Sequence, residues 1–174
     1  NAPLPFGRPQ GLFQLRWADF IVREIPEDGD CEPLVLTDLR PPPAPLDRGL
    51  ISFVMYKENR TTADALQQLA TASGCPLSLL AVAGTKDRRA VTVQRVTAFR
   101  LTAKRLADAL GRLPAGDALV VGALRYEAEP LRLGMLAGNH FTIVLRDVRA
   151  EPAAVEAALR ALVDKARRPP APPA

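Results

Sequence analysis

The chain has 174 residues, of which 48% are hydrophobic and 24% are charged, and its formal net charge is +4. This length is typical of one ordinary domain that buries about 70% of its unfolded surface, and the composition excludes a largely disordered chain. No apolar run approaches the roughly 18 residues of a membrane span, and two cysteines with one histidine are too few for a disulfide framework or a structural zinc site. We therefore expect an intracellular protein with no membrane partner and no metal.

Hydrophobic patterning predicts a strand-rich chain with three interleaved helices. The predicted strands cover residues 12–16, 20–25, 33–39, 50–56, 81–83, 90–101, 118–126 and 141–148. Helices are expected after the capping residues Thr61 and Thr102 and from Pro152 to residue 166, and a short helical turn is expected over residues 76–80. Gly74 and Pro76 are expected to end the first helix. This order predicts an α+β fold, in which helices cover one face of a mixed or antiparallel sheet.

Proline marks the segments that we expect to lie outside the sheet. Residues 41–45 read PPPAP and predict a rigid extended loop, because proline cannot donate to a ladder of backbone hydrogen bonds. The Pro- and Ala-rich residues 169–174 are expected to form a tail, and residues 1–10 an N-terminal extension. The domain itself is therefore expected to span residues 11–168.

Positive charge is concentrated in one stretch. Residues 84–112 carry eight basic and two acidic side chains, whereas residues 1–83 carry seven basic and ten acidic ones. Such a run is typical either of a solvated helix face with a charged loop or of an electropositive patch for a phosphate backbone. Composition does not choose between these two interpretations.

The loop after residues 81–83 combines a glycine, an aspartate and flanking cations. Residues 83–94 read AGTKDRRAVTVQ, so Asp87 lies between Lys86 and Arg88. Neighbouring positive charge favours the ionised carboxylate, which suits Asp87 to be a nucleophile or an electrostatic stabiliser rather than a general acid. The alternative interpretation is that Asp87 caps a turn or pairs with Arg88 at the surface.

This loop resembles the signature of the TruD-type pseudouridine synthases, and its sequence is similar to that of the eukaryotic branch of the family. Residues 132–142 (RLGMLAGNHFT) resemble the family's Leu-Gly and Gly-Asn-x-Phe box. Residues 19–25 (DFIVREI) resemble its N-terminal Asp-Phe-x-Val-x-Glu strand, and residues 56–59 (YKEN) fit as well. The four segments occur in the family's order over residues 11–148, which identifies the chain as the N-terminal part of a TruD-type catalytic domain.

The resemblance implies an enzyme that isomerises uridine to pseudouridine in RNA without cofactor or metal. Asp87 maps onto the family's essential aspartate, Phe141 onto an aromatic residue that stacks on a base, and Asn139 onto an amide that orients the loop or the substrate. The remaining substrate-binding candidates are Lys86, Arg88, Glu24 and Gln14. The implied partner is RNA: transfer RNA, and also small nuclear RNA or messenger RNA. The implied location is nuclear or cytoplasmic, and a mitochondrial location stays open.

The residues themselves also permit structural roles at these positions. Phe141 begins an apolar segment and is typical of a core residue, Asn139 is typical of a turn, and Glu24 is typical of a surface ion pair. His140, the single histidine, is assigned no role.

Two features depart from the family pattern. Gln14 stands where the family usually has a lysine near the catalytic carboxylate, so a neutral amide replaces a charge. Family members are also considerably longer, so we expect this chain to be the first segment of the catalytic domain and the C-terminal half of the same protein to be its partner. The alternative function is a non-catalytic homologue that binds RNA or a ribonucleoprotein. We predict that this chain alone binds RNA weakly and does not isomerise it.

Overall fold

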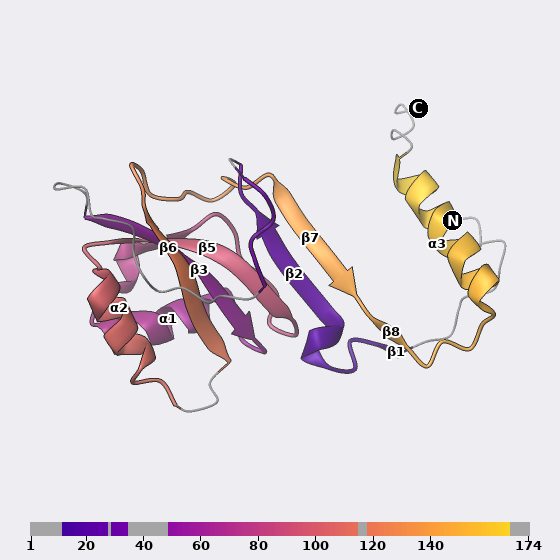
Figure 1. Ribbon diagram of the computed structural model, residues 1–174, viewed down its shortest axis with the longest axis horizontal. Helices are drawn as coiled ribbons and strands as arrows, with labels where there is room; N and C mark the ends of the chain where they lie inside the picture. Colours follow the sequence, from indigo (N-terminus) through magenta and orange to yellow (C-terminus); the bar gives the residue numbers. More distant parts are fainter. Residues whose placement is uncertain (1–11, 28, 35–48, 115–117, 168–174) are drawn as a thin grey trace. The chain divides into compact units, whose positions relative to one another are not determined.

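A computed structural model describes residues 12–27, 29–34, 49–114 and 118–167 of the chain (Figure 1). The predicted extension at 1–10, the proline loop at 41–45, the tail at 169–174 and most of the candidate strand at 33–39 lie outside these residues. Pro33 and Leu34, which are described, are not in a strand. The chain divides into two compact units, one formed by residues 16–143 and the other by the residues before and after them.

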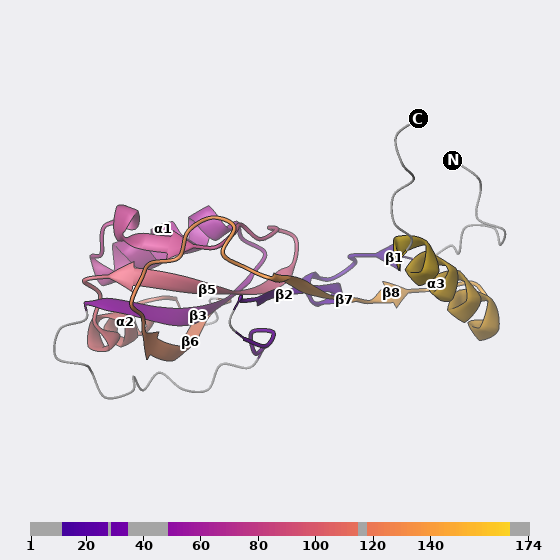
Figure 2. The same ribbon diagram turned by 90° about the horizontal axis from the view of Figure 1, so that it is seen from above.

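The larger unit is built on a mixed sheet of six strands. The strands are β2 (Phe20–Ile25), β3 (Leu50–Glu58), β4 (Leu80–Val82), β5 (Val91–Phe99), β6 (Leu119–Tyr126) and β7 (Gly138–Ile143). They lie in the order β6-β3-β5-β2-β7, and β4 pairs with β5 away from this path. Only the β2–β5 pair among these described ladders is parallel. Figure 2 shows β6, β3 and β5 side by side in that order.

Two helices cover one face of this sheet, which confirms the predicted α+β architecture (Figure 1). Helix α1 (Thr62–Ser73) begins after Thr61, whose side chain accepts a hydrogen bond from the Asp64 backbone N–H, and it ends at Gly74, where φ is +64°. Helix α2 (Ala103–Leu110) is capped by Thr102 in the same way. The core between the helices and the sheet includes Phe53, Met55, Leu69, Val96, Leu106 and Val121.

Polar side chains are buried beneath the opposite face. Arg95 of β5 donates to both carboxylate oxygens of Glu32, at 2.6 and 3.0 Å, and also to the Ser52 hydroxyl at 3.3 Å. The hydroxyl of Thr97 accepts a hydrogen bond from the backbone N–H of Leu131 at 3.0 Å. Segments before β3 and after β6 therefore cover this face and satisfy its polar groups, as burial requires.

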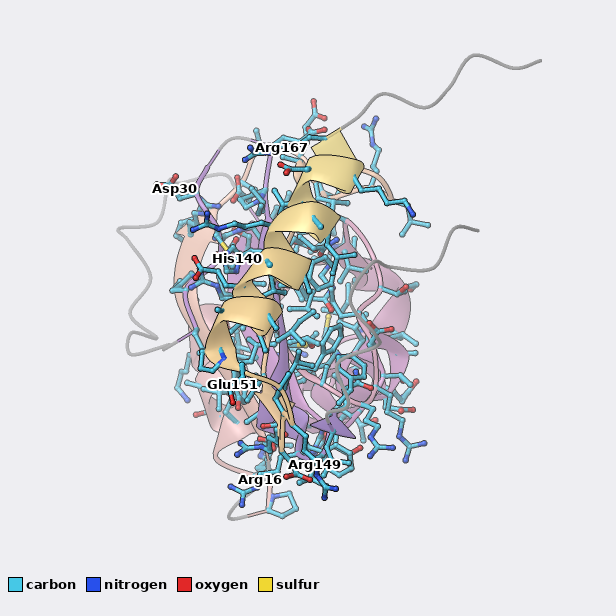
Figure 3. All side chains as sticks on the ribbon, turned by 90° about the vertical axis from the view of Figure 1, so that its right-hand side faces the viewer. Arg16, Asp30, His140, Arg149, Glu151 and Arg167 are labelled. Carbon is cyan, nitrogen blue, oxygen red and sulfur yellow. The ribbon has the colours of Figure 1, made fainter. Side chains whose placement is uncertain are left out.

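The smaller unit contains strand β1 (Leu12–Phe13), strand β8 (Leu145–Arg146) and helix α3 (Pro152–Arg167). Strands β1 and β8 pair antiparallel, with Leu12 opposite Arg146. Figure 3 shows α3 with Glu151 just before its first turn and Arg167 in its last turn. Its apolar side chains Leu159, Leu162 and Val163 are half-exposed. None of the helices within the described ranges is long and apolar enough to cross a membrane.

Several predicted strands have different bounds in the structure. The strand expected at 12–16 ends at Phe13, because Gln14 adopts φ of +53°, in the left-handed region that an extended strand cannot contain. The strand expected at 141–148 begins earlier, at Gly138, and divides at Val144 into β7 and β8. The predicted strand 90–101 is shorter by one residue at its start and two at its end, as β5.

Candidate active site

Strand pairing brings together three of the segments that resemble the family: residues 19–25, 83–94 and 132–142. Strand β2 pairs in parallel with β5 and antiparallel with β7, so that Val22 lies opposite both Thr92 and Phe141. The loop of residues 83–90, which carries Asp87, connects β4 to β5. Residues opposite each other in a ladder share a face, so Glu24, Asn139 and Phe141 lie on one face of the sheet. Thr92 continues this face to Lys57 of β3.

The backbone of the Asp87 loop is fixed by buried polar side chains. The Gln94 amide donates to the carbonyl of Gly84 at 2.8 Å, and the Thr62 hydroxyl accepts from the Lys86 backbone N–H at 2.9 Å. The same hydroxyl donates to the Gln94 side-chain oxygen at 2.9 Å, so the two anchors support each other. The Asp87 side chain itself is exposed. The exposed carboxylate of Asp87 thus lies on a loop whose backbone is held by the buried side chains of Thr62 and Gln94.

Lys57 is the third anchor of this loop. Its side chain is fully buried, and its ammonium group donates to the carbonyls of Arg60, Asp87 and Lys86 at 2.8, 3.0 and 3.4 Å. Burial lowers the pKa of Lys57 from 10.5 to about 8, although attraction to Asp87 opposes this and repulsion by Lys86 and Arg60 adds to it. Lys57 therefore ties the end of β3 to the loop through a charged group that titrates in an accessible pH range.

We expect the buried ammonium of Lys57 to give stability a distinctive pH dependence. Because its pKa is about 8 when folded and 10.5 without burial, the unfolded chain holds more protons between these values. The free energy of unfolding should therefore rise with pH between about 8 and 10.5, relative to Lys57→Met. Urea titrations of both proteins across this range measure the difference. The exposed Lys104→Met is the control and should keep the wild-type pH profile, whereas equal profiles for wild type and Lys57→Met would contradict the assignment.

Lys86 and Glu24 form a buried ion pair beneath the loop. The Lys86 ammonium lies 2.6 Å from a Glu24 carboxylate oxygen, and both side chains are almost fully buried. The other Glu24 oxygen accepts the backbone N–H of Arg95 at 3.1 Å. The surface ion pair considered for Glu24 is therefore wrong, because its partner and its surroundings are both in the interior. This pair joins strand β2 directly to the loop that carries Asp87.

Phe141 and Asn139 lie on β7, the last strand in the order of the six-stranded sheet. Phe141 is 52% exposed, so it is not a core residue of the described chain, and its ring lies 5.9 Å from that of Phe20, centroid to centroid. Asn139 is exposed and lies in a strand opposite Glu24 rather than in a turn. Two aromatic rings and an amide are thus available on the face that also holds the Glu24–Lys86 pair. His140, between them in the sequence, lies opposite Arg23 in the ladder.

The basic stretch of residues 84–112 does not form one continuous patch. Lys86 and Arg95 are buried in ion pairs with Glu24 and Glu32. Further along, Arg105 and Arg112 donate to the carbonyls of Ser73 and Ala72 at the end of α1, and Lys104 pairs with Asp108. Arg88 and Arg89, which follow Asp87 directly, are exposed, and Arg100 is exposed over the ring of Phe99.

The structure does not bring every candidate to Asp87. Gln14 belongs to the smaller unit, so its position is described only within that unit. Two hollows in the larger unit, of about 470 Å³ beside α1 and about 380 Å³ beside residues 127–135, are lined by other residues than Asp87. Among the described residues, no group of three histidine, cysteine, aspartate or glutamate side chains could hold a metal ion, and Cys31 and Cys75 are free thiols.

The family model of tRNA pseudouridine synthase D (TruD) matches residues 8–172, almost the whole chain. The chain belongs to the TruD family. Among its relatives, the pseudouridylate synthase 7 homolog of Bos taurus is 41% identical over 110 residues, which are 63% of this chain and 16% of the relative. The multisubstrate pseudouridine synthase 7 of Schizosaccharomyces pombe is 42% identical over 112 residues, also 63% and 16%. These matches confirm the resemblance to the eukaryotic branch.

Bacterial and archaeal TruD proteins match more of the chain at lower identity. The tRNA pseudouridine synthase D of Thermus thermophilus is 33% identical over 147 residues, covering 83% of this chain and 38% of the relative. A crystal structure described as tRNA pseudouridine synthase D from Methanosarcina mazei shares the fold, with a TM-score of 0.73 and 22% identity, over 95% of this chain and 34% of that one. The chain therefore spans less than two fifths of each of these TruD proteins and corresponds to their N-terminal part.

Three buried side chains that position the Asp87 loop lie outside the predicted set of site residues. They are Lys57, Thr62 and Gln94, which together hold the backbone of the loop. The available signal was the alternation Phe53, Met55, Lys57, which places a lysine on the buried face of a strand. Phe20 was recognised only as part of a motif, and its contact with Phe141 depends on the pairing of β2 with β7.

Proposed function

We propose that the protein that contains this chain isomerises uridine to pseudouridine in RNA, with Asp87 as the essential carboxylate. The observation that carries this proposal is the Asp87 loop, whose backbone is anchored by Lys57, Thr62 and Gln94 while the carboxylate faces solvent. Membership of the TruD family, whose named members are pseudouridine synthases, gives the reaction class. Fixing a reactive group in advance avoids the entropy loss of ordering it during the reaction.

The proposed reaction changes the connection between base and sugar and leaves the composition unchanged. The glycosidic C–N bond breaks, the uracil turns, and a C–C bond forms between the sugar and the base, while a proton moves from that carbon of the ring to the released nitrogen. A carboxylate at Asp87 acts at the nucleoside as nucleophile or base and is regenerated, so no external reactant is consumed. The target uridine must first leave its stack, which costs a few kcal/mol and least for an unpaired base.

The neighbouring side chains suit the binding of an extruded pyrimidine. The rings of Phe20 and Phe141 offer an apolar surface on which a base can stack, a contact that contributes about 1–3 kcal/mol per base. Asn139, exposed beside them, can donate to and accept from the edge of uracil. The buried Glu24–Lys86 pair is too enclosed to contact RNA and instead positions the loop.

The test is to map pseudouridine in RNA after incubation with the full-length protein and with its Asp87→Asn variant. Because the chain spans only 16% of the bovine relative, we propose that further segments of the protein complete the site and that this chain alone binds RNA weakly. Transfer RNA is the first substrate to test, since relatives are named for it, and small nuclear and messenger RNA follow.

A second candidate function is RNA binding without chemistry. Two observations favour it: Gln14 in place of the family's lysine, and the exposed Arg88 and Arg89, which would bind phosphates whether or not Asp87 reacts. The two functions separate in one comparison, because a binding protein would retain RNA while neither wild type nor Asp87→Asn converts uridine.

Neutralising Arg88 and Arg89 should weaken RNA binding and its salt dependence. Each phosphate contact on single-stranded RNA contributes about 0.7 to the slope of log affinity against log salt, so Arg88→Gln with Arg89→Gln should flatten the slope by about 1.4. Fluorescence anisotropy at several salt concentrations measures it. The matched control is Lys104→Gln with Arg112→Gln, which lie in the same basic stretch but bond to helix residues. Equal slopes for the wild type and the Arg88 and Arg89 double variant would show that this loop does not contact the RNA backbone.

A further inference from the structure

Trp17 is the single tryptophan of the chain, and it lies partly exposed ahead of strand β2. It begins the 3-10 turn η1 (Trp17–Asp19), and 36% of its surface is accessible. Tryptophan carries a large apolar ring that folding usually covers, so an exposed one beside a proposed RNA site suggests a binding role.

The turn that presents Trp17 is held by a buried carboxylate. Asp19 is 1% exposed, and its side chain accepts the backbone N–H of Arg16 at 3.0 Å. The Asp19 backbone N–H in turn donates to the carbonyl of Arg16 at 3.0 Å. This reciprocal pair closes the turn around Trp17, so the position of its backbone is defined before any ligand binds.

Arg89 connects this turn to the Asp87 loop. Its guanidinium carbon lies 5.8 Å from the centroid of the Trp17 ring, within the range of a cation–π interaction. Arg89 is two residues after Asp87, and strands β2 and β5, which follow the turn and the loop, run parallel with Ile21 opposite Val91. The starts of parallel strands lie at the same end of a sheet, which explains why these two side chains meet.

We propose that Trp17 and Arg89 form a nucleotide subsite that stacks an unpaired base next to the uridine presented to Asp87. This inference rests on the proposed action of the protein on RNA. When a uridine leaves its stack, the adjacent base loses a stacking partner, and an indole with a planar guanidinium can replace it. The positive charge of Arg89 also favours the phosphate that joins the two nucleotides.

The single tryptophan makes the subsite directly observable. The 174-residue chain is titrated with a short single-stranded oligouridylate while the fluorescence of Trp17 is followed. Stacking of a base on the indole should quench the emission in a saturable manner. Inorganic polyphosphate offers the same charge without bases, so it should bind near Arg89 and leave most of the emission unquenched.

Substitutions then test whether the ring itself contributes to affinity. Anisotropy of a labelled oligouridylate should show about tenfold weaker binding for Trp17→Leu, equivalent to about 1.4 kcal/mol, and a much smaller loss for Trp17→Phe, which keeps an aromatic face. Arg89→Lys keeps the charge but not the planar group, and it should fall between wild type and Arg89→Gln. Thermal unfolding of each variant checks that the fold persists. If Trp17→Leu does not fold, the subsite is judged from the quenching of the wild type and the affinity of Trp17→Phe.

The outcomes separate this subsite from the proposed reaction. Asp87→Asn should keep the quenching in the 174-residue chain, and the same substitution should remove pseudouridine formation by the full-length protein. Absence of quenching, or equal affinities for wild type, Trp17→Phe and Trp17→Leu, would overturn the subsite and leave the reaction untouched. Quenching with the expected order of affinities, but without any conversion of uridine by the full-length protein, would retain the subsite and reject the enzyme.

Discussion

Substituting Asp87 by asparagine should abolish pseudouridine formation by the full-length protein. The change removes one charge from the exposed end of the loop and preserves size, so the anchors of the loop backbone at Lys57, Thr62 and Gln94 stay in place. A positioned acid–base group contributes about 10²–10⁴-fold to rate, and an asparagine amide cannot replace a carboxylate as nucleophile or base. Conversion should therefore fall by at least that factor. Chemical mapping of pseudouridine in a transfer RNA substrate measures it.

The Asp87→Asn result has a matched control in the same loop. Arg88→Gln also removes a charge from an exposed neighbour, and it should weaken RNA binding without eliminating conversion at saturating RNA. RNA affinity of Asp87→Asn should stay close to wild type or rise slightly, because a negative charge facing phosphates is lost. Equal conversion by wild type and Asp87→Asn would remove Asp87 from the mechanism.

The second large effect concerns stability. Lys86→Met should lower the free energy of unfolding by about 3–5 kcal/mol, because it leaves the Glu24 carboxylate buried without its cation. Glu24→Gln together with Lys86→Met removes both charges and should recover part of this loss. Urea denaturation of the wild type, both single variants and the double variant gives the coupling energy between the two side chains.

An exposed ion pair provides the comparison for this cycle. Lys104 and Asp108 lie 2.8 Å apart on α2, with 84% and 47% of their side chains accessible. Water screens such a pair, so Lys104→Met should cost about 0.5 kcal/mol or less. Additive effects of the Glu24 and Lys86 substitutions, without measurable coupling, would contradict the buried pair. Because this pair joins β2 to the loop, its loss should also increase hydrogen exchange at the backbone amide of residue 86. In the wild type this amide donates a hydrogen bond to the Thr62 hydroxyl.

Local sequence signals were sufficient for the helices of the larger unit. Thr61 and Thr102 both act as side-chain caps, and Gly74 ends α1 in the left-handed conformation. These predictions succeed because capping and a positive φ depend on residues only a few positions apart. The predicted strand bounds at 12–16 and 141–148 were wrong, since the turns at Gln14 and Asp147, both with φ near +50°, carry no glycine to indicate them.

The family of the chain, and the Asp87 loop as its candidate site, could be recognised from consecutive residues. A TruD domain was recognisable from the charges around Asp87 and the motifs at residues 19–25 and 132–142. Each of these motifs is a run of neighbouring residues, so its recognition does not depend on the fold. The tertiary structure alone decided which charges face solvent. Lys86 and Arg95 are buried by partners 62 and 63 residues away, whereas Arg88 and Arg89 are exposed. Burial depends on strand pairing across such separations, so charges that are equivalent in the sequence have different surroundings in the fold.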